Sequence, residues 1–210
     1  MTVRTLTDPP YEPVSRTQAK LWCKVTATAD DTLIDMLIKG MREYAENLTG
    51  RTFVQRTLQL ILTGYQYLEI DGTRRIGIEL PYPPLISVES VTYIDTDGAT
   101  QTLATTEYNV HTWREPGIVI EDWDVTWPSY RREPDAIRVN YTAGYAPSGS
   151  PTDETAYQLD LPANLKLWMQ ARIATLYDNR EQVVANNAIQ IPRDFADGLL
   201  DSLIVGTRIF

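Results

Sequence analysis

Few side chains in this sequence could carry out catalysis. The 210-residue chain has one histidine, His111, and one cysteine, Cys23. A Ser-His-Asp or Cys-His arrangement would have to use His111 as its base. His111 stands close to Trp113 in a segment with strand character, so we expect a packed or surface imidazole there. Cys23 follows Trp22 in a helical pattern, where we expect a buried, inert thiol.

Two acidic segments are candidates for metal binding or hydrolysis. Asp95–Gly98 resembles the start of a calcium loop but lacks the third ligand position and the downstream glutamate, so a hairpin turn explains it. Glu121, Asp122 and Asp124 include paired carboxylates of the kind that glycosidases use, and we interpret them as a solvated loop. The sequence has no Gly-rich phosphate-binding motif and no CxxC pair. We therefore expect no catalytic residue, no metal site and no cofactor, and hence no enzyme.

Three tryptophans, Trp113, Trp123 and Trp127, precede Tyr130 in a segment with several loop signals. Rings that face inward would cap one end of a β unit, and this is the arrangement we favour. Rings that face outward would form a stacking platform for sugars or a hot spot for a protein neighbour.

Helical patterns stand at both ends of the chain. Ser15 and Gln18 form a capping-box pattern before a short helix, and a stronger helix runs from Asp31 to a stop at Gly50. The main apolar stripe of the stronger helix is Leu33, Leu37, Met41, Tyr44 and Leu48, widened by Ile34, Ile38 and Ala45. Pro162 opens a third helix, which we expect to pack on the helix that starts at Asp31. A last helix is expected from about Pro192 to Ile204.

Between these helical blocks the residues change to β-branched and aromatic types separated by turn residues. The strands that we predict are Thr57–Leu62, Tyr67–Ile70, Ile76–Leu80, Ser87–Ile94, Gln101–Leu103, Tyr108–His111, Gly117–Ile120 and Ala136–Tyr141. We expect a glycine with positive φ at the turns formed by Gly72, Gly98 and Gly117.

The sequence therefore predicts an α+β fold: a helical bundle formed by the N- and C-terminal helices, with an inserted antiparallel β-sandwich or barrel-like unit. Residues 1–52 form the N-terminal helical part and residues 53–145 the inserted β unit. Residues 146–160 are polar and rich in Pro, Ser and Gly, which predicts a mobile loop. Residues 161–210 carry the C-terminal helices and a tail, and should pack with residues 1–52.

The net charge of the chain limits its partners. Nineteen basic and 28 acidic residues give a net charge of −9, which argues against a protein that grips nucleic acid through phosphates. An acidic wall is compatible with DNA that passes without binding. No apolar run approaches the roughly 20 residues that a membrane span needs, and the N-terminus lacks the regions of a signal peptide, so we expect a globular protein synthesised in the cytoplasm.

The chain ends on two apolar residues, Ile209 and Phe210. Such a tail either folds back on its own core or docks into another subunit, since short tails often become ordered only on binding. The sequence leaves these two alternatives open.

Five segments carry a resemblance to a known family. They are SRTQAKLW (15–22), YAENLTGR (44–51), IELPYPPLISVESVTYIDTDG (78–98), VNYTAGYA (139–146) and LYDNRE (176–181). In this order and spacing they resemble the head-tail connector (adaptor) proteins of tailed phages, the gp6-like or phiE125 gp8-like family. The chain departs from that pattern in its longer loop at residues 146–160 and in its C-terminal segment.

The resemblance implies a structural virion protein in the neck, at the head-tail interface. Members form a homo-oligomeric ring, commonly a dodecamer, beneath the portal protein, and present a surface to a stopper or tail-completion protein. The helices build the ring, DNA passes through an acidic channel without specific binding, and no membrane is involved. The resemblance assigns portal binding to the C-terminal segment Leu203, Ile204, Val205, Gly206, Thr207, Arg208, Ile209 and Phe210.

Two hypotheses from other classes remain open. The first is a monomeric β-sandwich module that binds a glycan or receptor through Trp113, Trp123 and Trp127. The second is a hydrolase that uses His111. Loss of turnover on substitution of His111 would favour the hydrolase.

Overall fold

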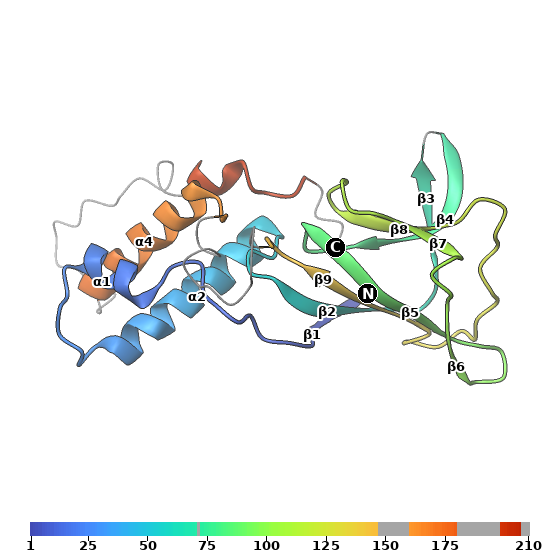
Figure 1. Cartoon of the computed structure of the whole chain (residues 1–210), viewed down its shortest axis with the longest axis horizontal. Coiled ribbons are helices and arrows are strands. Elements are labelled where there is room, and N and C mark those ends of the chain that lie inside the picture. The colour runs from blue at the N-terminus through green and yellow to red at the C-terminus, as the bar shows by residue number, and fades with distance from the viewer. Residues whose placement is uncertain (71, 147–159, 180–197, 207–210) are drawn as a thin grey trace. The chain divides into compact units, whose positions relative to one another are not determined.

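The computed structural model of the chain is shown in Figure 1. It describes residues 1–70, 72–146, 160–179 and 198–206. The predicted mobile loop falls almost entirely outside these residues, as do the first six residues of the predicted last helix. Within the described ranges, no helix is both long enough and apolar enough to cross a bilayer.

The chain divides into two compact units. Residues Met1–Pro10 and Gln55–Tyr145 form one, which we call the β unit. Residues Tyr11–Val54 and Ala146–Phe210 form the other, which we call the helical unit. Helices and antiparallel sheets thus lie in separate units, and the fold is α+β, as the sequence predicted.

The helical unit contains α1 (Arg16–Cys23), α2 (Asp31–Thr49) and α4 (Ala163–Asp178), which contact one another pairwise. The packing of α4 on α2 confirms the expectation for the helix after Pro162. Residues 198–201 are also helical, and a turn follows them. The last helix therefore ends three residues before the predicted Ile204.

The helix ends form as their sequences predict. The Ser15 hydroxyl accepts the Gln18 N–H (3.2 Å), and the Gln18 side-chain oxygen accepts the Ser15 N–H (3.1 Å), which completes the capping box of α1. Gly50 ends α2 with φ of 71° and donates its N–H to the Glu46 carbonyl. This left-handed conformation is one that glycine adopts without steric cost.

The deepest face of α2 differs from the predicted stripe. Ile34, Ile38 and Ala45, which we expected only to widen the stripe, are at most 3% exposed, whereas Tyr44 is 54% exposed. The cause is that polar residues share the buried face. They are Arg42, Glu46 and Thr49. Periodicity assigns such residues to the surface, because a sequence does not reveal that Arg42 binds Glu46 or that the Thr49 hydroxyl donates to the Ala45 carbonyl.

The β unit contains two antiparallel sheets. The order of the first is β1 (Thr2–Thr5), β2 (Arg56–Leu62), β9 (Ile137–Ala143), β5 (Leu85–Ile94) and β6 (Thr100–Thr102). The order of the second is β3 (Gln66–Ile70), β4 (Thr73–Leu80), β8 (Gly117–Glu121) and β7 (Tyr108–His111). All eight strands that the sequence predicted are confirmed, with ends that agree within three residues.

Strand β1 is the element that sequence patterns missed. The prediction assigned residues 1–52 to the helical part, but Thr2–Thr5 pair with β2, and Val3 lies opposite Leu60. The strand is short, and Val3 is its one side chain packed against the core. Four residues at a sheet edge are too few for a detectable alternation.

The two sheets bury one common hydrophobic core. Leu60 and Val139 of the five-stranded sheet and Ile78 and Val119 of the four-stranded sheet are fully buried in it. Strand β2 shows the alternation that places such residues inside, since Leu58, Leu60 and Leu62 are buried while the residues between them are half-buried.

The proline-rich connection between β4 and β5 is held by β9. The Tyr141 hydroxyl donates to the Pro81 carbonyl (2.9 Å), and the Gly144 N–H donates to the Pro84 carbonyl (2.9 Å). Tyr82, between these contacts, has φ of 62°, which is uncommon for a residue with a side chain. Contacts from a distant strand therefore fix this connection.

At one of the predicted turn glycines, Gly117, close packing and not turn geometry explains the glycine. Gly72 and Gly98 have positive φ, as expected, but Gly117 does not and lies in β8. A Cβ at Gly117 would stand 2.5 Å from the Leu85 side chain. Close packing of β5 residue Leu85, and not turn geometry, therefore requires the glycine.

The hydrogen bond from β9 to the proline-rich connection can be tested with Tyr141→Phe. Loss of the hydroxyl leaves the Pro81 carbonyl without this donor, so we expect the free energy of unfolding in urea to fall by about 1–2 kcal/mol. Tyr65→Phe is the control, because the Tyr65 hydroxyl is buried with no hydrogen-bond partner among the described residues. Its stability should stay equal or rise, and an equal loss in both variants would contradict the assignment.

Candidate functional site

The two side chains singled out for nucleophilic chemistry have structural surroundings. His111 ends the edge strand β7, and its Nδ1 accepts the Trp113 indole N–H (3.3 Å). Cys23 is buried, as predicted, and burial raises the pKa of its thiol. A thiol in this state is protonated and a weak nucleophile.

The acidic segment at the end of β8 (Gly117–Glu121) and in the loop after it uses its carboxylates for local structure. Glu121 accepts the Ile76 N–H (3.3 Å), and Asp122 accepts the side-chain amide of Asn109. Asp124 is exposed and has φ of 66°. These contacts hold the loop in place, and they do not pair two carboxylates across a site.

The Asp95 segment is the hairpin turn that the sequence predicts. The Asp95 carboxylate accepts the Gln101 side-chain amide and the N–H groups of Ala99 and Asp97. These hydrogen bonds, the one from Gln101 above all, lower the pKa of Asp95. Over the described part of the chain, no group of three or more His, Cys, Asp and Glu residues could hold a metal ion.

The three tryptophans do not share one environment. Trp127 is 4% exposed, donates its indole N–H to the Glu107 carbonyl (3.0 Å) and packs edge-on against Tyr65. Trp113 and Trp123 are 81% and 85% exposed. The inward arrangement is therefore correct for Trp127 and wrong for the other two, whose loops carry no periodicity that would show their direction.

The two exposed tryptophans lie at opposite ends of one strand pair. In the β7–β8 ladder, His111 pairs with Ile118 and Tyr108 pairs with Glu121. Trp113 follows the His111 end and Trp123 follows the Glu121 end, so the three rings do not form the single platform that a glycan module would need.

The described part of the predicted portal-binding segment is fixed to the end of α2. The Leu203 carbonyl accepts Arg51 Nε (2.5 Å), and the Val205 N–H donates to the Thr49 carbonyl (2.9 Å). Leu203 is 9% exposed and Ile204 is 43% exposed. Residues 207–210 of the predicted segment lie outside the described residues.

A second contact holds this segment to the start of α4. The Asn164 side-chain amide donates to the Leu199 carbonyl (2.8 Å) and to the Ser202 hydroxyl (3.0 Å). We call residues 198–206 the C-terminal anchor. The last carbonyls of a helix need partners from outside it, and Val205 supplies one for α2. Sequence reasoning missed Arg51 and Asn164, because the groups they bind are mainly backbone carbonyls.

A buried charge network centres on Arg42 of α2. Arg42 is 2% exposed, and it donates to Glu12 (2.8 Å) and to Glu46 (2.9 Å). The other Glu46 oxygen accepts the Phe53 N–H (3.0 Å). Burial raises the pKa of Glu12, although the hydrogen bond from Arg42 opposes this shift. Burial disfavours the charge on Arg42, but the two glutamates outweigh it and raise the pKa of Arg42.

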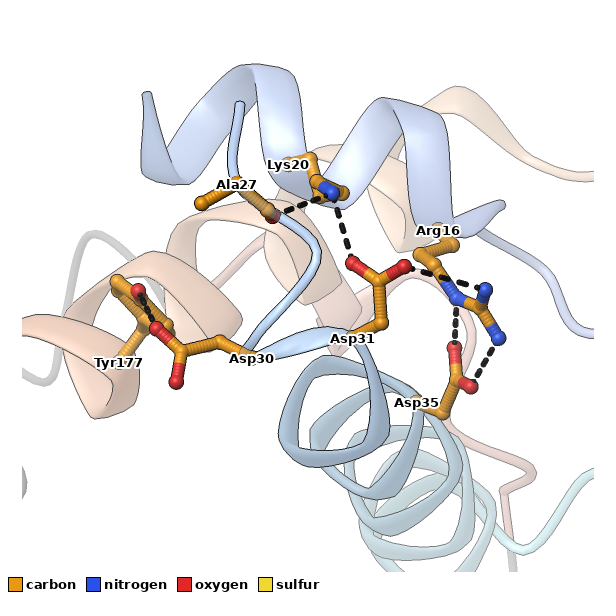
Figure 2. Close-up of polar contacts among 7 residues, drawn as sticks. All are labelled: Arg16, Lys20, Ala27, Asp30, Asp31, Asp35 and Tyr177. Carbon is orange, nitrogen blue, oxygen red and sulfur yellow. Dashed lines mark hydrogen bonds and ion pairs between the residues drawn. The ribbon is translucent and has the colours of Figure 1, made fainter. Parts of the chain in front are cut away.

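The start of α2 is fastened by a more exposed set of polar contacts, shown in Figure 2. Arg16 pairs with Asp31 and Asp35, and Lys20 Nζ lies 2.7 Å from both Asp31 Oδ1 and the Ala27 carbonyl. On the α4 side, the Tyr177 hydroxyl donates to Asp30. These contacts fix how α1 and α4 meet α2.

Solved structures show where this fold occurs. A chain in the "Neck of empty GTA particle computed with C6 symmetry" matches with a TM-score of 0.74 and 15% identity, over 100% of this chain and 98% of that one. A chain in the "Virion of native gene transfer agent (GTA) particle" matches with a TM-score of 0.71 and 17% identity, at the same coverage. A chain in the "Neck of native GTA particle computed with C12 symmetry" matches with a TM-score of 0.64 and 17% identity, again at the same coverage.

The chain has the fold of these neck and virion chains along its whole length. No protein-family model matches the sequence, and no curated protein matches it. At this level of identity, the shared property is the fold.

The importance of the buried network can be tested with Arg42→Met. The variant removes the buried guanidinium that binds both the buried Glu46 and the half-buried Glu12, so we expect the free energy of unfolding to fall by about 3–5 kcal/mol. In the matched control Arg16→Met, the loss should be much smaller, because the ion pairs of Arg16 are exposed and such pairs contribute little. Chemical denaturation measures both, and comparable losses would contradict a special role for the buried charge.

Proposed function

We propose that this chain is a structural protein of a virion neck, a head-tail connector (adaptor) of the gp6-like or phiE125 gp8-like kind. The observation that carries the proposal is the fold match to neck chains over 100% of this chain and 98% of theirs. A match that spans nearly all of both chains favours the same kind of part in the same kind of particle.

We propose that copies of the chain form a closed ring, with twelve copies as the expected number. The neck structures that share the fold were computed with C6 and C12 symmetry. Contacts between two different patches of identical subunits produce a ring when the rotation closes. In this account the helices pack as a bundle that builds the ring, and the two sheets form a sandwich.

The C-terminal tail is the proposed contact with the portal protein. The anchor holds residues 203 and 205 on the helical unit through Arg51 and Thr49, so the chain beyond Gly206 starts from a fixed point. Thr207–Phe210 would then supply the apolar pair Ile209 and Phe210 to a groove on the portal. Ile204 is the exposed apolar residue of the anchor itself and would border that contact.

The charge of the chain fits a channel for DNA. A net charge of −9 gives a ring of twelve copies a strongly acidic character, and an acidic wall repels the phosphate backbone within about 8 Å at physiological salt. DNA would pass without specific binding, and a stopper or tail-completion protein would bind the opposite side of the ring.

The portal contact can be tested by deletion of Thr207–Phe210. The truncated chain should keep the unfolding temperature of the full chain, because the anchor contacts remain, and should no longer co-sediment with portal-bearing particles. The full-length variant Ile209→Ala/Phe210→Ala should lose binding as the truncated chain does, because the apolar pair carries the proposed contact. Unchanged co-sedimentation of the truncated chain would refute the tail contact.

A further inference from the structure

Trp123 stands out among the exposed side chains of the β unit. It is 85% exposed and lies between Asp122 and Asp124 in the loop that follows β8. Tryptophan is the residue type most enriched at the energetic centres of protein interfaces. An indole held in water between two carboxylates therefore needs an explanation outside the isolated chain.

The loop presents Trp123 in an ordered conformation. One backbone carbonyl, that of Glu107, accepts both the Asp122 N–H (3.1 Å) and the Trp127 indole N–H (3.0 Å). The Val125 N–H closes the turn onto the Asp122 carbonyl (3.3 Å), and Asp124 takes a left-handed φ of 66°. The loop is tied on both sides of Trp123, so little conformational freedom is lost when a partner binds.

A hollow of about 380 Å³ lies on the other sheet of the same unit. The side chains that form it include Arg4, Gln59, Ile61, Pro134, Asp135 and Arg138. Leu58 and Leu60 of β2 point into the core, so the alternating residues Gln59 and Ile61 face away from it. The hollow therefore opens on the solvent side of the five-stranded sheet.

The charge of this hollow complements the loop that carries Trp123. Arg138 pairs with Asp135, whereas Arg4 is exposed and has no ion pair within 4 Å among the described residues. Guanidinium groups stack on indole rings, and Ile61 and Pro134 offer apolar contact. Arg4 at the rim would meet the carboxylates of Asp122 and Asp124.

We propose that Trp123 of one copy inserts into the hollow beside Arg4 and Arg138 of the next copy. The loop follows a strand of the four-stranded sheet and the hollow lies on the five-stranded sheet. In the proposed ring each copy uses one patch toward each of its two neighbours, which is the head-to-tail arrangement that ring closure requires. This inference rests on the proposed neck ring, and it adds a ring contact made by the β unit to the contacts made by the helices.

The test compares two tryptophans that are equally exposed. Full-length wild type, Trp123→Ala and Trp113→Ala are titrated onto portal-bearing particles, and rings are counted by electron microscopy. We expect Trp113→Ala to assemble as wild type does and Trp123→Ala to need about 30-fold more protein, since removal of a hot spot weakens an interface at least this much. Equal unfolding temperatures would show that both variants are folded.

A charge exchange tests the pairing itself. Arg4→Glu and Asp124→Lys should each weaken assembly, and the double variant should recover most of it, because the opposite charges are restored across the contact. No recovery, together with a Trp123→Ala variant that assembles normally, would overturn the inference. Binding of a glycan that Trp123→Ala abolishes while rings stay normal would overturn it too.

These outcomes separate the inference from the function on which it rests. Wild-type rings that are insensitive to Trp123 contradict the contact alone. Absence of wild-type rings at the portal vertex contradicts the proposed neck function, and the contact with it.

Discussion

The buried guanidinium of Arg42 is the constraint on which the helical unit depends. Its partners are Glu12, which precedes α1, and Glu46, which also holds the Phe53 N–H. Glu12 and Phe53 stand within two residues of the points where the chain passes between the units, after Pro10 and after Val54. A charge this deeply buried is stable only with its partners in place, so one network ties α2 to both ends of the segment Tyr11–Val54, which forms α1 and α2.

The last turn of α2 extends this constraint to the proposed function. Arg51 and the Thr49 carbonyl hold the C-terminal anchor at the end of α2, so the proposed portal-binding tail would leave from a point that hydrogen bonds fix. In the β unit, a single carbonyl of Glu107 orders the loop that presents Trp123. In both units, contacts with backbone groups position the surfaces that we assign to partners, and the described part of the chain holds no metal cluster that could do so.

Local patterns predicted most of the fold. The capping box at Ser15, the stop at Gly50 and eight strands follow from short-range propensity and were correct. What could not be predicted depends on partners distant in sequence. Local patterns place Arg42 on the surface, because they do not show that Glu12 lies beside it. They do not show β1 either, because that strand forms only by pairing with β2. Trp123 and Trp127 are the same residue type four positions apart, yet Trp127 is buried and Trp123 is exposed. The indole of Trp127 binds the Glu107 carbonyl, a partner 20 residues away that no local pattern reveals.

The central claim is that the chain forms a ring in a virion neck, and the most direct measurement is electron microscopy of the purified protein mixed with portal-bearing capsids. The account predicts a ring of density at one vertex of each particle, with cyclic symmetry, and none on capsids that lack a portal. Protein that stays free of the particles, or that covers the capsid shell without preference for the portal vertex, would contradict it.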